Sequence, residues 1–213
     1  MINKTITLAI TCCNEKSTIK RAVDSATTSK YITEILISDD WSTDGSFELL
    51  NSLARNNSRI NLIRNSGKPY SLRYNRLNLI YNIESDYVMF LDGDDYIECI
   101  DEVIEKCFKL GEWDICYYPI KIGDDVLSMG VGYLDSKSNE ELSHLCNHYI
   151  CKTTALKGVN GGIVYNDYIS DDQITLYILN HCKLVGTLCD SDCYYMYNDG
   201  GKLRHFRKFG LKK

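Results

Sequence analysis

The sequence has no apolar run that approaches the roughly 20 residues a helix needs to cross a bilayer. Its first fifteen residues, MINKTITLAITCCNE, include a short apolar stretch that no cleavage-site pattern follows. Both absences argue against a membrane-spanning or signal segment. We therefore expect an untargeted, soluble protein in the cytoplasm, either free or at a membrane surface.

The ten cysteines include no CxxC pair with the spacing of a zinc site. They lie along a chain of 213 residues, which is long enough to bury a core without disulfides. We expect those in apolar surroundings to serve as small core residues, namely Cys12, Cys107, Cys116 and Cys182.

Positive charge is scarce outside the last twelve residues, KLRHFRKFGLKK, which hold six of the 24 Lys and Arg and no acid. The remaining chain carries 18 basic against 29 acidic residues, which argues against a general nucleic-acid binder. Two interpretations of the basic tail stay open. It either holds a diphosphate, a phosphorylated lipid surface or a polyanionic acceptor, or is a solvated terminus.

Strand-like and helix-like segments alternate along the first half of the chain. The apolar patterns predict strands at 5–11, 34–40, 60–65 and 86–92, with helices between them, the first at 17–28. A further strand is predicted in EWDICYYPIKI and a hairpin in GDDVLSMGVGYLD. Strands separated by helices pair in parallel, so we expect an α/β fold with helices on both faces of the sheet.

Polar residues follow three of these strands, in TCCNE, SDDWSTDGS and DGDD. In open α/β sheets, ligands bind where the carboxyl ends of the strands meet, so we expect a site at this rim.

The stretch YVMFLDGDDYI sends an apolar strand directly into three carboxylates, Asp92, Asp94 and Asp95. If the backbone stays extended, Asp92 and Asp94 face the same way while Asp95 turns aside. With Gly93 adding no bulk, such a pair suits Mg²⁺ or Mn²⁺ that also holds phosphate oxygens. The alternative is an acidic turn that caps the next helix, YIECIDEVIEKCFKL.

Taken in order, CNE (13–15), ILISDDWSTDGS, FLDGDD and SDDQITLYIL resemble the motifs of the family 2 glycosyltransferases over roughly residues 5 to 200. This resemblance implies the GT-A fold, a mainly parallel sheet with a small antiparallel portion on the acceptor side. It implies one domain over 1–213, with a nucleotide-sugar-binding half (1–110), an acceptor-side half (111–200) and the basic tail (201–213).

The resemblance also assigns roles by position. Asp40 corresponds to the contact with the nucleotide base, Thr11 and Cys13 to the wall beside it, and Asp94 to the principal metal ligand with Asp92 assisting. Asp172 corresponds to the catalytic base. The residues expected to bind the nucleotide sugar are Thr11, Cys13, Glu15, Asp40, Arg73, Arg76, Asp92 and Gly93.

Three positions leave alternatives open. Either Arg73 or Arg76 corresponds to the family's arginine near the diphosphate, or both are solvent-facing helix charges. Cys13 stands where the family usually has an aromatic residue, so stacking on the base is either weaker or supplied elsewhere. Trp41 replaces a small residue and either forms a wall of the base pocket or packs under the loop.

The expected activity is transfer of a sugar from a nucleoside-diphosphate sugar, with UDP as the expected nucleotide, to an acceptor hydroxyl. A divalent metal, Mn²⁺ or Mg²⁺, would neutralise the leaving diphosphate, and one carboxylate base with no second nucleophile implies inversion. Acceptors in this family include glycans, lipid-linked sugars and proteins, and modified nucleic-acid bases are retained as a further class. The alternatives are a nucleotidyltransferase, which the absence of glycine from TCCNEKSTIKR disfavours, and a non-catalytic nucleotide-sugar-binding module.

Overall fold

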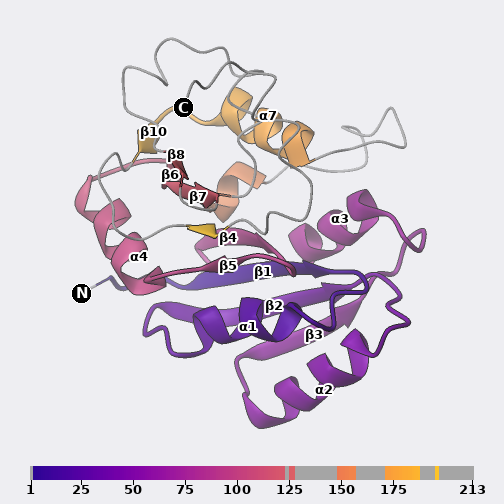
Figure 1. Ribbon diagram of the computed structural model, residues 1–213. Helices are drawn as coiled ribbons and strands as arrows, with labels where there is room; N and C mark the ends of the chain where they lie inside the picture. The colour runs from indigo at the N-terminus through magenta and orange to yellow at the C-terminus, as the bar shows by residue number, and fades with distance from the viewer. Residues whose placement is uncertain (1, 123–124, 128–147, 157–170, 188–194, 197–213) are drawn as a thin grey trace.

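The computed structural model describes residues 2–122, 125–127, 148–156, 171–187 and 195–196. The first half of the chain contains β1 (Ile6–Cys12), α1 (Ile19–Thr27), β2 (Ile32–Asp39), α2 (Ser46–Asn56), β3 (Ile60–Arg64), α3 (Leu72–Asn82), β4 (Tyr87–Asp92), β5 (Tyr96–Ile97) and α4 (Ile100–Lys109). Then follow β6 (Ile115–Tyr117), β7 (Ile120–Ile122), β8 (Asp125–Leu127), β9 (Tyr149–Lys152), the short 3-10 helix η1 (Thr153–Leu156), α7 (Asp171–His181), β10 (Val185–Thr187) and β11 (Tyr195–Met196). The alternation of strands and helices predicted from the sequence is confirmed (Figure 1).

The central sheet has seven strands in the order β10-β6-β9-β4-β1-β2-β3. β1 pairs in parallel with β2 and β4, β2 with β3, and β10 with β6. β9 runs antiparallel to both of its neighbours, β4 and β6. The sheet is therefore mainly parallel, as expected, with one antiparallel strand inserted near its middle.

Two apolar cores cover the two faces of this sheet. Side chains alternate along a strand, so Leu8 and Ile10 of β1 enter one core while Ala9 between them enters the other. The first core receives buried residues of α1, α2 and α4, and the second receives those of α3 and α7. Figure 1 shows α1 and α2 below the sheet and α3 and α7 above it. Helices thus cover both faces, as the α/β class requires.

A second, four-stranded sheet has the order β5-β11-β7-β8, in which β11–β5 and β7–β8 are antiparallel and β11–β7 is parallel. The single strand predicted for EWDICYYPIKI is divided into β6 and β7, because Pro119 between them lacks a backbone N–H for the ladder. The helix predicted to begin at Tyr96 begins instead at Ile100, after β5.

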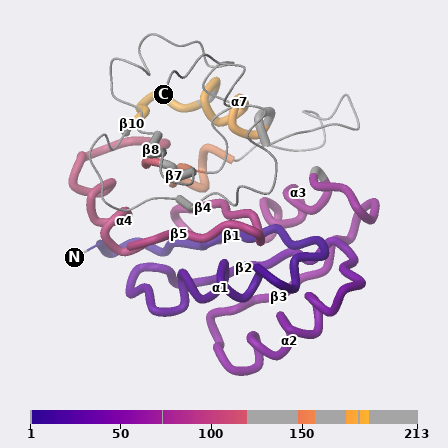
Figure 2. Tube along the Cα trace, in the orientation of Figure 1, coloured from indigo at the N-terminus to yellow at the C-terminus, as the bar shows by residue number. Residues whose placement is uncertain are grey.

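The strands β1, β2 and β4 run side by side through the molecule, and their carboxyl ends meet at one edge (Figure 2). The register places Thr11 opposite Asp92, and Cys12 opposite Asp39. Polar residues distant in sequence are thereby gathered at this rim. Within the described ranges, every helix is too short or too polar to cross a bilayer.

Candidate functional site

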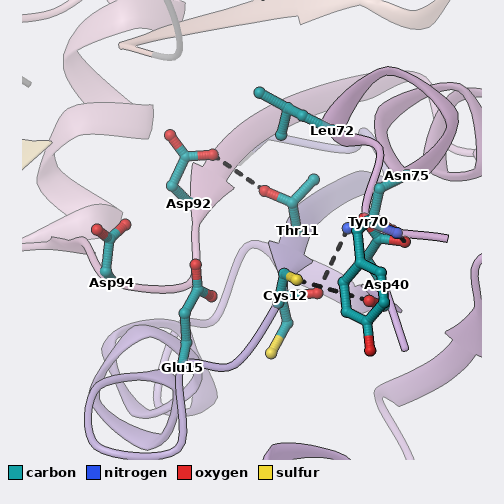
Figure 3. A pocket seen from close by; sticks show the side chains of 10 residues that line it. Thr11, Cys12, Glu15, Asp40, Tyr70, Leu72, Asn75, Asp92 and Asp94 are labelled. Carbon is teal, nitrogen blue, oxygen red and sulfur yellow. Dashed lines mark hydrogen bonds between the residues drawn. The ribbon is translucent and has the colours of Figure 1, made fainter. Parts of the chain in front are cut away.

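A pocket of about 220 Å³ opens at this rim of the sheet (Figure 3). Its walls come from the ends of β1, β2 and β4, from the loop before α3 and from α3 itself. The residues that line it are Thr11, Cys12, Cys13, Glu15, Asp40, Tyr70, Leu72, Asn75, Asp92 and Asp94. Six of these, Thr11, Cys13, Glu15, Asp40, Asp92 and Asp94, are residues that the sequence predicted for the site.

At one side of the pocket, the carboxylate of Asp92 is held by two donors. Thr11 Oγ1 donates a hydrogen bond to Asp92 Oδ1 at 3.0 Å, across the β1–β4 pair. Arg76 Nη2 forms an ion pair with the same oxygen at 3.0 Å. The Arg76 side chain is only 2% exposed and its guanidinium lies over the Phe90 ring. Asp92 is thus fixed in orientation by the sheet on one side and by α3 on the other.

The structure describes the side chain of one of the two arginines that the sequence left undecided. Arg76 is buried and reaches the acidic side of the site, so it is not a solvent-facing helix charge. Arg73 lies in the first turn of α3, and its side chain is outside the part of the chain that the structure describes.

The DGDD segment forms a turn and does not continue the strand. β4 ends at Asp92, and the backbone N–H of Asp95 donates to the carbonyl of Asp92 at 3.0 Å. The expectation of an extended backbone is therefore wrong, although the turn still brings both Asp92 and Asp94 to the pocket while Asp95 is buried. The alternative that this turn caps the next helix is also wrong, since α4 begins at Ile100 beyond β5.

Gly93 in this turn has no room for a side chain. A Cβ added there would lie 2.0 Å from Glu15 Oε2 and 2.8 Å from the backbone oxygen of Thr11. The loop after β1 and the DGDD turn therefore pack against each other through Gly93. This close approach brings the Glu15 carboxylate to the same side of the pocket as Asp92 and Asp94 (Figure 3).

The opposite side of the pocket is built around Asp40, which is 2% exposed. Its Oδ1 accepts a hydrogen bond from Asn65 Nδ2 at 2.7 Å and one from the backbone N–H of Tyr70 at 2.9 Å. Because Asn65 follows β3 and Tyr70 precedes α3, Asp40 ties the connection between β3 and α3 to the end of β2.

Trp41, next to Asp40, is not among the pocket-lining residues. Its indole Nε1 donates to the carbonyl of Asn65 at 3.0 Å, and its ring lies beneath the guanidinium of Arg64. Of the two roles left open by the sequence, the structure therefore supports packing under the loop.

Two thiols from the end of β1 border the pocket. Burial, together with the negative charges of Asp40 and Glu15, raises the pKa of Cys13 to about 11. Burial and the charges of Glu15 and Asp39 raise the pKa of Cys12 further still. Both residues are therefore neutral thiols at physiological pH and contribute a weakly polar wall. The expected core position is confirmed for Cys12, Cys107 and Cys116, and Cys182 is half-buried.

The acidic side of the pocket has the donor types that suit a hard divalent cation. Carboxylate oxygens are the ligands that Mg²⁺ and Mn²⁺ prefer, and Asp92 and Asp94 could hold such an ion. Within the described residues, no group of three or more His, Cys, Asp or Glu forms a complete metal site by itself. A cation held by Asp92 and Asp94 would therefore need further ligands, such as the oxygens of a bound phosphate group.

Asp172 lies in the first turn of α7, so the SDDQITLYIL motif opens a helix, as it does in the family that it resembles. The side chains of Asp171 and Asp172 are outside the described part of the chain, as are the basic tail 201–213 and the segment with Gly161 and Gly162.

Four pocket residues were not predicted for the site from the sequence: Cys12, which was expected only in the core, Tyr70, Leu72 and Asn75. One face of α3 carries Leu72, Asn75 and Arg76, which have the i, i+3, i+4 spacing. Since Arg76 was expected at the site, this spacing could have predicted that Leu72 and Asn75 lie there too. Tyr70 follows the carboxyl end of β3, and the rule that places sites at strand ends could have identified it.

Comparison with known proteins identifies the family. Residues 7–128 match the family model described as glycosyl transferase family 2. The match covers more than half of the chain, and the chain therefore belongs to glycosyl transferase family 2, as the order of its motifs implied.

Three similar proteins illustrate the relationship. The curated glycosyltransferase GlyA of Streptococcus pneumoniae serotype 4 is 30% identical over 111 residues, which cover 51% of this chain and 15% of that protein. S. aureus TarS 1-349 in complex with UDP-GlcNAc has a TM-score of 0.73 at 18% identity, over 94% of this chain and 60% of that one. The mannosyltransferase PcManGT from Pyrobaculum calidifontis, in complex with GDP-Man and Mn²⁺, has a TM-score of 0.68 at 14% identity, over 96% and 64%.

At such identities the two structures establish the fold, which is the GT-A fold expected from the motifs. The chain spans about one seventh of the length of its curated relative and less than two thirds of either structure.

Proposed function

We propose that this chain is the catalytic domain of a glycosyltransferase that moves a sugar from a nucleoside-diphosphate sugar to an acceptor hydroxyl with inversion. The observation that carries the proposal is the pocket itself. Asp40 stands at one side and Asp92 with Asp94 at the other, delivered by the carboxyl ends of two strands, β2 and β4 (Figure 3). Such a pocket matches a ligand that has a hydrogen-bonding base at one end and a diphosphate at the other.

The size of the pocket agrees with this division. Its 220 Å³ lies below the roughly 300–1,000 Å³ typical of small-molecule sites, so it accounts for the nucleotide end of the donor. We assign the acceptor to the half formed by residues 111–200.

We favour UDP as the nucleotide. TarS is described in complex with UDP-GlcNAc and with UDP, and PcManGT with GDP-Man. Uracil and guanine each have a ring N–H that can donate a hydrogen bond to a carboxylate such as Asp40. The rings of cytosine and adenine have no such N–H. In this proposal Asp40 therefore selects for a base with a ring N–H, and the smaller uracil suits the small pocket.

Asp94 is the proposed principal ligand of a divalent cation, with Asp92 assisting. Asp92 Oδ1 already accepts from Thr11 and Arg76, which supports the secondary role for Asp92. When bound, the cation would supply charge neutralisation for the departing diphosphate. Arg76, paired with Asp92, keeps that carboxylate oriented toward the donor.

Asp172 is the proposed catalytic base. It takes the proton of the acceptor hydroxyl while the hydroxyl oxygen forms a bond to the anomeric carbon. The bond from that carbon to the diphosphate breaks, and its electron pair leaves with the nucleoside diphosphate. One displacement with no enzyme nucleophile inverts the configuration.

A nucleotidyltransferase is the rival on a similar sheet, and it would need backbone N–H groups after β1 to bind phosphate. Those of Asn14, Glu15 and Lys16 are already bound by side chains of the next motif, namely by Ser42 Oγ at 2.9 Å, Ser46 Oγ at 3.0 Å and Asp44 Oδ2 at 2.9 Å. A loop whose donors are taken by protein groups cannot hold a triphosphate through them. The structure therefore favours the glycosyltransferase.

The proposal is tested by the thermal midpoint of the purified chain with UDP, GDP, CDP, ADP and their sugars, each with and without Mn²⁺. A ligand at about one hundred times its Kd adds roughly 2.7 kcal/mol to the free energy of unfolding, which shifts the midpoint measurably. We expect a Mn²⁺-dependent shift with UDP and UDP sugars and none with CDP or ADP. No shift with any nucleoside diphosphate would contradict the proposal.

An enzyme releases the nucleoside diphosphate when acceptors are added, whereas a binding module does not. A nucleotidyltransferase would instead consume UTP and a sugar phosphate and release pyrophosphate.

A further inference from the structure

Tyr70 has a combination of exposure and backbone strain that its packing does not require. Its side chain lines the pocket and is 62% exposed, so its ring contributes little to the core. Its φ is +55°, in the left-handed region that non-glycine residues rarely adopt. Such strain persists only where the surroundings fix it, and it is concentrated at ligand sites.

The contact that fixes Tyr70 is its backbone N–H, which donates to Asp40 Oδ1 at 2.9 Å. Asn65 Nδ2 donates to the same oxygen at 2.7 Å and also to the carbonyl of Lys68 at 3.1 Å. The connection from β3 to α3 is therefore anchored on Asp40 at both of its ends. Through this anchoring, an exposed aromatic ring is held beside the carboxylate proposed to recognise the base.

Among the residues that the structure describes, those on the β1 side of the pocket offer no comparable surface. Cys13 presents a neutral thiol, and Thr11 and Cys12 are almost completely buried. Trp41 is turned away to Asn65 and Arg64. Among the residues that line the pocket, Tyr70 is the one with an aromatic ring. Figure 3 shows that ring at the Asp40 side, away from Asp92 and Asp94.

We propose that Tyr70 is the platform on which the base of the nucleoside diphosphate stacks, while Asp40 accepts the ring N–H of the same base. Every nucleobase has a π face, so an aromatic side chain adds affinity for any base and leaves the choice of base to Asp40. The inference rests on the proposed function, since it needs a nucleotide in this pocket. The connection between β3 and α3 then provides the aromatic contact that Cys13 cannot provide.

The test compares the affinity of Tyr70 variants for UDP in the presence of Mn²⁺ by isothermal titration calorimetry. Tyr70→Leu keeps an apolar side chain of similar size but removes the aromatic face, and we expect the Kd to rise about tenfold. Tyr70→Phe keeps the face and should bind within about twofold of the wild type. Tyr81→Leu is the matched control, because Tyr81 is 61% exposed on α3 and does not line the pocket. It should leave the Kd unchanged.

Unchanged affinity in Tyr70→Leu would overturn the inference, and so would an equal loss in Tyr70→Phe or in Tyr81→Leu. Because the side chain is exposed, Tyr70→Leu should melt with the same midpoint as Tyr81→Leu in the absence of ligand. Failure of the proposed function is distinguishable, because the wild type itself would then bind neither UDP nor any other nucleoside diphosphate.

Discussion

Arg76 and Asp92 form an ion pair that joins α3 to the carboxyl end of β4, with Nη2 and Oδ1 3.0 Å apart. The arginine side chain is 2% exposed and the aspartate side chain 18%. A charge this deeply buried needs its partner, because the interior cannot solvate it. The pair therefore connects the stability of the fold with the geometry of the candidate site.

Replacement of Arg76 should be costly. Arg76→Met removes the cation and leaves the Asp92 carboxylate without it, so the free energy of unfolding should fall by about 3 kcal/mol. Lys20→Met is the control, since Lys20 forms an exposed pair with Asp24 and should lose less than about 1 kcal/mol. Urea denaturation measures both. Equal losses in the two variants would show that the Arg76 pair does not stabilise the fold.

Gly93 should tolerate no side chain. In Gly93→Ala the Cβ would meet Glu15 Oε2 and the backbone of Thr11, and we expect a loss of about 1–3 kcal/mol in unfolding free energy. Glu15→Ala in the same chain removes the closest of the three clashes, the others being with Ile19 Cδ1 and the Thr11 backbone oxygen, and should restore part of the loss. Gly186→Ala is the matched control, because its nearest atom would lie at 3.3 Å. A loss in Gly93→Ala no larger than in that control would contradict the tight packing of the turn.

The positions of the site residues were largely predictable from the sequence because they depend on local rules. Apolar strands that end in polar residues, in an α/β chain, predict that Thr11, Asp40 and Asp92 meet at one rim, and they line one pocket. The turn at Gly93 was not predicted, since nothing in DGDD distinguishes an extended strand from a turn until β5 and α4 are placed.

The ion pair between Arg76 and Asp92 could not be predicted from the sequence either, because this contact depends on how α3 packs across the sheet. The strand-end rule points to the region of Tyr70, but it does not predict the backbone hydrogen bond from Tyr70 to Asp40, thirty positions away. Such contacts are properties of the tertiary structure.

Substitutions in the two acidic motifs should separate binding of the donor from transfer of the sugar. Asp94→Ala should abolish the Mn²⁺-dependent shift in thermal midpoint produced by UDP, because it removes the proposed principal ligand of the cation. Asp172→Asn should keep that shift and reduce transfer by about 10²–10⁴-fold, the usual contribution of a general base. Transfer is measured as release of UDP in the presence of acceptor. Near-normal transfer by Asp172→Asn would show that another residue is the catalytic base.

The reactivity of the Cys13 thiol should depend on the charge of its neighbour Asp40. Burial and the Asp40 charge raise the pKa of Cys13 to about 11, so iodoacetamide should modify it slowly at pH 8 and faster as the pH approaches 11. Asp40→Asn removes one of the charges that raise the pKa, and modification at pH 9 should accelerate. Mass spectrometry of the Cys13 peptide measures the rate.

Bound UDP should protect Cys13 from modification and leave Cys99, an exposed thiol outside the pocket, unaffected as an internal reference. An unchanged Cys13 rate in Asp40→Asn would show that the two groups are not electrostatically coupled.

Asp114 should make the stability of the sheet depend on pH. The backbone N–H of Lys183, the ammonium of Lys152 and the backbone N–H of Leu184 hold the pKa of Asp114 below its ordinary value of 3.8. A carboxylate whose pKa is lower in the folded state stabilises the fold above the unfolded pKa, and this contribution is lost as the pH falls through the folded pKa. The contribution should therefore be complete at pH 5 to 7 and decline below about pH 4.

Asp114→Asn measures this contribution directly. The carboxylate accepts from Lys183 N at 2.7 Å, Leu184 N at 3.1 Å and Lys152 Nζ at 2.9 Å, and thereby joins the start of β6 to β9 and to the residues before β10. The neutral amide should lower the urea midpoint at pH 7 and have a smaller effect at pH 3, because the stabilisation by a carboxylate with a lowered pKa declines below the ordinary value of 3.8. If the difference between wild type and variant were the same at both pH values, the ionised form of Asp114 would not be what holds these strands together.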